Sequence, residues 1–90
     1  MDWSLLQGFL ELSRYGSLSA ASRALGVSQP TLSRRLAELE GALGVSLFLR
    51  GARGLVLTAA GERMLKVAER MREAASWVPD VRPTTGAAPT

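Results

Sequence analysis

The most informative segment of this chain reads Ser28-Gln29-Pro30-Thr31-Leu32-Ser33-Arg34. Ser28 is a favourable helix N-cap, and Pro30 suits a first helical turn because its missing N–H has no intrahelical partner there. The segment therefore predicts the beginning of a helix. With Leu32 facing the core, the first two turns expose a glutamine, a proline, two hydroxyl groups and an arginine.

This helix is expected to run from about 29 to 43. Its leucines fall within roughly 60° of one another at 100° per residue, which predicts one apolar face made by Leu32, Leu36, Leu39 and Leu43. Gly44 ends the helix. A short helix of small residues precedes it, capped by Ser19 and ending at about Leu25, and Gly26-Val27-Ser28 forms the turn between the two.

A first helix and a hairpin lie on either side of this pair. The apolar spacing predicts a helix from about Asp2 to Tyr15, closed by Gly16 in a left-handed conformation. Two β-leaning segments, 45–50 and 55–58, flank a four-residue loop that is bounded by glycines and contains Arg53, which predicts a hairpin.

The last helix is expected to be capped by Thr58, to reach about Val78 and to stop before Pro79, with a flexible tail over 79–90. At 1.5 Å per residue this helix is roughly 30 Å long, more than a small domain can cover. Its apolar stripe is therefore expected to pack partly on the domain and partly on a second copy of the chain, through Met64, Leu65, Val67, Ala68, Met71 and Ala75.

Three helices followed by a hairpin are typical of a winged helix-turn-helix, in which the third helix enters the major groove of DNA. The expected fold class is therefore mainly α. It comprises a winged helix-turn-helix domain over 1–58, with its wing at about 46–58, and a linker and dimerisation helix over 59–78. Two such domains related by a two-fold axis would read an interrupted palindrome.

The composition excludes several classes of site. The 90 residues contain no cysteine and no histidine, which removes disulfides, thiol catalysis and the commonest general base and metal ligand. With no paired-carboxylate or glycine-rich phosphate motif, we expect no enzyme, no cofactor and no metal. No apolar run approaches the ~20 residues of a membrane helix, and no signal peptide is visible, so a soluble, cytoplasmic protein without membrane contacts is expected.

The outward side chains of the third helix suit the edges of DNA bases. Gln29 can bond adenine through a paired donor and acceptor, and the hydroxyls of Thr31 and Ser33 can donate or accept. The Pro30 ring can pack on a thymine methyl group, and Arg34 can reach guanine or a phosphate. Each residue alone has an ordinary structural explanation, but their gathering on one face after a tight turn favours base recognition.

A second set of residues suits the DNA backbone and the minor groove. Arg53 at the hairpin tip can enter the minor groove, where negative potential concentrates. Arg50 is better placed for a phosphate, and Ser19 and Ser28 at helix N-termini are further candidates. For Arg53, the alternative is an ordinary surface charge in a loop. For Ser19 and Ser28, the alternative is a purely structural role as helix N-caps.

The chain resembles the N-terminal DNA-binding domain of the LysR-type transcriptional regulators over about residues 2–78. The resemblance lies in Gly16-Ser17-Leu18, Ala21-Ser22-Arg23-Ala24-Leu25, Val27-Ser28-Gln29-Pro30-Thr31-Leu32-Ser33, Leu39-Glu40, Leu43-Gly44, Leu47-Phe48-Leu49-Arg50, Arg53 and Leu57-Thr58-Ala59-Ala60-Gly61. Ser22 and Leu18 depart from the usual alanine and phenylalanine but keep the size class or the apolarity.

The resemblance implies a helix-turn-helix motif at about 18–37 and a linker helix that pairs two subunits. It implies that Gln29, Pro30, Thr31, Ser33 and Arg34 face the major groove, with Arg53 on the wing. Such bacterial, nucleoid-associated regulators activate or repress promoters in response to a small-molecule inducer, often as dimers of dimers. The effector domain is absent from this chain, so an inducer is a partner only if the full-length protein has a C-terminal domain.

Other functions explain less of the sequence. A helical dimerisation or protein-interaction module without specific DNA binding would use the last helix, but it leaves the polar 29–34 face unexplained. An RNA-binding protein would need an aromatic stacking platform, and the five aromatic residues sit mainly at apolar positions. The molybdate-responsive regulators share most of the expected architecture.

Overall fold

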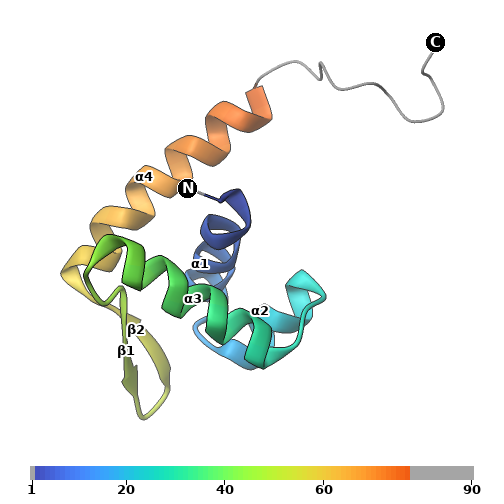
Figure 1. Ribbon diagram of the computed structural model, residues 1–90, viewed down its shortest axis with the longest axis vertical. Coiled ribbons are helices and arrows are strands. Elements are labelled where there is room, and N and C mark those ends of the chain that lie inside the picture. The colour runs from blue at the N-terminus through green and yellow to red at the C-terminus, as the bar shows by residue number, and fades with distance from the viewer. Residues whose placement is uncertain (1, 78–90) are drawn as a thin grey trace, which may run out of the picture.

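The computed structural model describes residues 2–77, which form four helices and one hairpin (Figure 1). The elements follow one another as α1 (Trp3–Tyr15), α2 (Leu18–Leu25), α3 (Gln29–Leu43), β1 (Phe48–Gly51), β2 (Gly54–Leu57) and α4 (Ala59–Trp77). The predicted mainly helical fold with a hairpin wing is confirmed. Val78, Pro79 and the tail over 79–90, for which the sequence predicts a helix end and a flexible segment, lie outside the described residues.

Local capping chemistry sets the boundaries of α1. The Asp2 carboxylate accepts the backbone N–H of Ser4 at 3.0 Å, and this hydrogen bond holds the pKa of that carboxyl below its usual value. Gly16 closes the helix at φ 71°, where its N–H donates to the Leu12 carbonyl. A residue with a Cβ rarely adopts this left-handed conformation, so the glycine predicted the break correctly.

The cap of α2 differs from the prediction. Ser17, not Ser19, is the N-cap, and its side-chain oxygen accepts the N–H of Ala20 at 3.1 Å. Both serines have a side-chain oxygen that can cap a helix, but α1 ends at Tyr15 with Gly16 as its C-cap, and Ser17 directly after it already has the extended backbone of an N-cap. Ser19 therefore lies inside the first turn of α2.

The turn between α2 and α3 is as predicted. Gly26 adopts φ 71°, Val27 is half-buried against the core, and Ser28 caps α3. The leucine face of α3 is only partly buried. Leu32 and Leu39 are inaccessible to solvent, whereas Leu43 at the last turn is 37% exposed.

The core lies between α1, α3, the hairpin and the first half of α4. Phe9 of α1 contacts Phe48 of β1 with ring centroids 5.4 Å apart. Gly8 lets α1 approach α3 closely, since a Cβ there would lie 3.0 Å from a methyl group of Leu32. The fully or nearly buried apolar residues are Leu5, Leu6, Phe9, Leu10, Leu12, Ala21, Leu32, Leu39, Leu47, Phe48 and Ala68.

The hairpin is tighter than the sequence suggests. Gly51 pairs with Gly54 across the two antiparallel strands, so Ala52 and Arg53 alone form the loop, in place of the expected four residues. Residues 45–47 precede the strand and are not part of it. The hairpin projects from the helical body (Figure 1). Close to its loop, the Leu55 N–H donates to the Gly16 carbonyl at 2.9 Å, which ties β2 to the turn after α1.

The helix α4 begins at Ala59 and is capped, as predicted, by Thr58, whose hydroxyl accepts the Gly61 N–H at 2.9 Å. Its later turns extend away from the three-helix body (Figure 1). Among residues 2–77, none of the helices combines the length and apolarity that crossing a lipid bilayer requires.

Candidate nucleic-acid interface

The first two turns of α3 present the predicted polar surface. The side chains of Gln29, Pro30, Ser33 and Arg34 are exposed, and Thr31 is half-buried. The helix begins at residue 29 with a proline in its first turn. The sequence therefore places these side chains on the solvent side of a helix whose opposite side carries the buried Leu32.

A chain of hydroxyl groups orders this surface. The backbone N–H of Thr31 donates to Ser28 Oγ at 3.2 Å, and Ser28 Oγ donates in turn to Thr31 Oγ1 at 2.9 Å. The guanidinium of Arg34 also donates to Thr31 Oγ1, at 3.5 Å. Ser28 is thus occupied as an N-cap, while Arg34 lies along the helix on a long, easily exchanged hydrogen bond.

A hollow of about 270 Å³ separates the beginning of α3 from the hairpin. The predicted Gln29, Ser19 and Arg50 all line it, together with Ser17, Leu18, Gly51, Gly54 and Leu55. The Ser19 hydroxyl accepts a hydrogen bond from the guanidinium of Arg23 at 2.8 Å. One cationic side chain therefore lines this hollow and a second lies one helical turn beyond Ser19, an arrangement that suits an anionic group.

A second hollow, of about 210 Å³, continues between α3 and the hairpin. Ser33, Ala37 and Glu40 line it from α3, and Arg50 faces it from β1. Arg50 borders both hollows and joins them into a groove between helix and wing. Arg53 is exposed in the two-residue loop and lines neither hollow.

Three polar residues of this region were missed at the sequence level: Ser17, Arg23 and Glu40. Ser17 and Ser19 are both possible N-caps by residue type, and the sequence alone favours neither. Arg23 follows Ser19 by the four-residue spacing that brings helical side chains together, and this spacing could have predicted their contact. Glu40 contacts residues seven and eight positions later, beyond the helix, and no local pattern predicts such a contact.

The residues predicted to join two copies divide into three groups. Ala68 is completely inaccessible within the chain, because α4 turns it onto α1 and the core, so it cannot contact a second copy. Met64 and Leu65 are half-buried against the same core. Val67, Met71 and Ala75 are exposed, with Val67 at 47% and Met71 at 44%.

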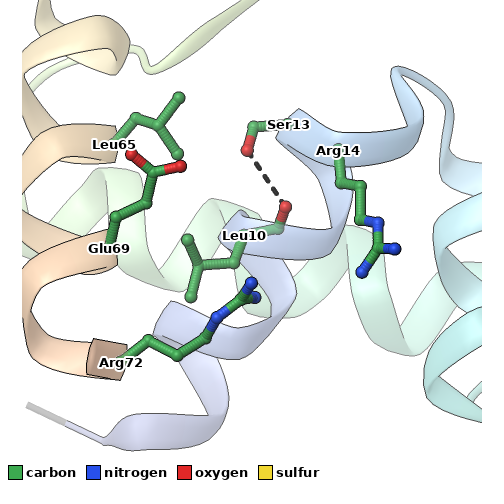
Figure 2. A pocket seen from close by; sticks show the side chains of 6 residues that line it. All are labelled: Leu10, Ser13, Arg14, Leu65, Glu69 and Arg72. Carbon is green, nitrogen blue, oxygen red and sulfur yellow. Dashed lines mark hydrogen bonds between the residues drawn. The ribbon is translucent and has the colours of Figure 1, made fainter. Parts of the chain in front are cut away.

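Two hollows flank α4. One, of about 280 Å³, is lined mostly by apolar side chains from the end of α3, the following loop and α4: Leu43, Val45, Leu47, Ala60, Arg63, Met64 and Val67. The other, of about 360 Å³, lies between α1 and α4 (Figure 2). Its charged side chains are Arg14, Glu69 and Arg72, and this mixture of signs favours no single kind of charged ligand. Within the described residues, no group of acidic side chains could hold a metal ion.

The sequence matches known regulators over most of its length. The family model described as bacterial regulatory helix-turn-helix protein, lysR family, matches residues 3–62. The HTH-type transcriptional regulator TfdS of Cupriavidus pinatubonensis is 44% identical over 73 residues, 81% of this chain and 25% of TfdS. The regulator HdfR of Escherichia coli is 44% identical over 71 residues, 79% of this chain and 25% of HdfR. The chain spans about a quarter of the length of these relatives.

Solved structures share its three-dimensional arrangement. The CbnR_DBD–DNA complex superposes with a TM-score of 0.80 at 41% identity, covering 84% of this chain and 87% of that one. The BenM_DBD/benA site 1 DNA complex gives a TM-score of 0.80 at 29% identity, covering 84% and 88%. Since the family model spans all three helices, the hairpin and the beginning of α4, the chain belongs to the lysR family of bacterial regulatory helix-turn-helix proteins.

Proposed function

We propose that this chain binds double-stranded DNA in a sequence-specific manner, as the DNA-binding part of a bacterial LysR-type transcriptional regulator. The observation that carries this proposal is the exposed polar beginning of α3 beside a groove bordered by Arg50. An α-helix fits the major groove of B-DNA, and short polar side chains at its N-terminal end reach base edges there. The likeness to two DNA-binding domains solved with DNA supports the same conclusion.

The major-groove surface consists of Gln29, Pro30, Thr31, Ser33 and Arg34. Gln29 and Arg34 have the reach for paired hydrogen bonds to adenine and guanine, respectively. Thr31 and Ser33 are shorter and suit bases that lie closer to the helix. Because Arg34 is held by a single long hydrogen bond, little has to be broken for its guanidinium to turn toward a base.

The DNA backbone would lie along the hollow between α2, α3 and the wing. Arg50 and the hydroxyl of Ser19, with Arg23 behind it, offer hydrogen-bond donors to a phosphate there. Ser28 contributes as the cap that fixes the beginning of α3. Arg53 at the wing tip would enter the minor groove, where its guanidinium meets the concentrated negative potential.

A homodimer would bring two such surfaces to one interrupted palindrome. Val67, Met71 and Ala75 are the exposed part of the α4 stripe, with Met64 and Leu65 at its edge. The same stripe favours the alternative of a helical dimerisation module without specific DNA binding. That alternative predicts dimers but no base preference. Response to a small-molecule inducer and action in the bacterial cytoplasm belong to the proposal for the full-length regulator.

A salt series tests the phosphate-driven part of the proposal. The chain is titrated with a labelled duplex while fluorescence anisotropy is recorded at several salt concentrations. Log K should fall linearly with log salt, with a slope of roughly −0.9 for each phosphate contacted. Absence of binding to random and palindromic duplexes at low salt would contradict the proposal.

A further inference from the structure

Glu40 joins the end of α3 to the beginning of the wing. Its carboxylate oxygen Oε2 accepts the backbone N–H of Leu47 at 2.7 Å and lies 3.4 Å from the N–H of Phe48. Its own carbonyl accepts the N–H of Gly44 at 2.8 Å, the bond that closes α3. One residue therefore both ends the helix and holds the backbone at the point where β1 begins.

The backbone held by Glu40 is also where the two ends of the wing meet. The Leu47 carbonyl accepts the Thr58 N–H at 3.0 Å, and the Thr58 hydroxyl donates to the Ser46 carbonyl at 2.7 Å. Gly61 passes directly against the Leu47 carbonyl, where a Cβ would collide with it. Since entry and exit strands are tied together at Leu47, a shift of the Glu40 carboxylate would displace the base of the wing relative to the contact that its loop end makes with Gly16.

The charge of Glu40 has the wrong sign for the DNA phosphates that are proposed to lie on this surface. Its side chain is half-buried and lines the same hollow as Ser33 and Arg50, on the surface proposed to face DNA. A carboxylate there repels phosphates, so electrostatics alone would favour a neutral or basic residue. The structural benefit of an acceptor that holds the Leu47 and Phe48 N–H groups therefore has to offset this repulsion.

We propose that Glu40 is a positioning residue for the wing. Its carboxylate fixes the distance between α3 and the hairpin, so that Arg53 reaches the minor groove while Gln29 and Arg34 occupy the major groove. This inference rests on the proposed function. Glu40 itself does not contact DNA; it determines the position of the wing relative to α3.

Two substitutions separate positioning from electrostatics. E40Q removes the charge but keeps an acceptor oxygen at the same reach, whereas E40D keeps the charge and shortens the reach by one methylene group. Positioning predicts that E40Q binds a selected duplex as the wild type does, or slightly tighter, and that E40D binds more weakly. A purely electrostatic role predicts that E40Q tightens binding and E40D leaves it unchanged. E38Q and E38D, at the exposed Glu38 on the same helix, are the matched controls.

A double-mutant cycle with R53A shows whether E40D weakens DNA binding by displacing the wing. Arg53 lies at the far tip, so direct interaction with Glu40 is negligible and any coupling must pass through the hairpin. We expect E40D and R53A each to weaken binding by roughly threefold to tenfold, the range for one lost hydrogen-bonded contact. In the R53A background, E40D should cost less than in the wild type, and the remaining cost should come from Arg50, which lies on β1 and moves with the wing.

Base preference supplies a measurement that general loss of stability does not change. In a selection from random duplexes, E40D should lose the preference at the minor-groove positions of the wing and keep that read by α3. Circular dichroism at the binding temperature verifies that each variant is folded. Additive effects of E40D and R53A, an E40D that binds as the wild type, or an R53A without effect would each overturn the inference. A wild type that binds no duplex would instead contradict the proposed function itself.

Discussion

Thr31 occupies the centre of the hydroxyl chain on α3. It accepts hydrogen bonds from Ser28 on one side and from Arg34 on the other, at 2.9 and 3.5 Å. Since a hydroxyl group has one rotatable donor besides its two lone pairs, Thr31 can still donate to an acceptor on a base. The Arg34 bond is the longer of the two, so the guanidinium can exchange it for a base or a phosphate at little cost.

Replacement of Arg34 by alanine should reveal whether this side chain reads a base. If Arg34 bonds guanine, R34A should cost about 1–3 kcal/mol on the preferred duplex and relax selectivity at one base pair. Anisotropy titrations on the preferred duplex and on duplexes changed at single positions provide the measurement. R70A, which removes an exposed arginine from α4, controls for lost charge. Equal weakening of every duplex would show that Arg34 contacts a phosphate.

At the scale of elements, the wing is held by a glycine contact. Gly54 adopts φ 119°, and a Cβ there would collide with the Gly16 carbonyl, the same oxygen that accepts the Leu55 N–H. A side chain at this position therefore strains the backbone and also separates β2 from the turn after α1. Gly51, its partner across the hairpin, has only ordinary van der Waals distance around the position of a Cβ.

This difference predicts a large effect on stability for one substitution and a small effect for its matched control. G54A should lower the free energy of unfolding by at least about 1–3 kcal/mol, the cost of one strongly unfavourable backbone conformation. G51A should change it by less than about 1 kcal/mol. Urea unfolding followed by circular dichroism measures both. Equal stability of the two variants would mean that the contact between Gly54 and Gly16 does not hold the wing.

Helix boundaries were the most predictable part of this fold, because they depend on local chemistry. Gly16, Gly26 and Gly44 take the left-handed conformation that their positions suggested, and α3 has the predicted bounds. The wing was less predictable. Pairing of Gly51 with Gly54 and the Glu40 contact with Leu47 depend on how separate elements meet. The exposure of the α3 face followed from periodicity, whereas the burial of Ala68 depended on the rotation of α4 against α1.

On the scale of the whole molecule, α4 carries exposed apolar side chains away from the body. Val67 and Met71 follow one another at the four-residue spacing that places them on one side of the helix. Val67 also borders the apolar hollow with Leu43 and Val45, which are themselves 37% and 45% exposed. A continuous apolar surface thus joins the end of α3 to the middle of α4, where a second copy can pack.

Charged substitutions on this surface should separate the two copies. V67E and M71E each place a carboxylate where the proposed partner would exclude water, so the double variant should sediment as a monomer at concentrations where the wild type is a dimer. V56E is the matched control, since Val56 on the wing is 59% exposed and lies outside this surface. Sedimentation equilibrium at tens of micromolar distinguishes the species. A wild type that is monomeric throughout this range would contradict the proposed dimer.

Sequence preference is expected to reside in the beginning of α3. Selection of duplexes from a random pool by the wild-type chain, followed by sequencing, measures this preference. We expect enrichment of an interrupted palindrome whose half-sites lie one or more helical turns apart, about 10 base pairs or a multiple. Q29A and R34A should each erase the preference at their own position and leave the rest. A recovered pool with no enriched sequence, or one unchanged by both substitutions, would contradict the claim.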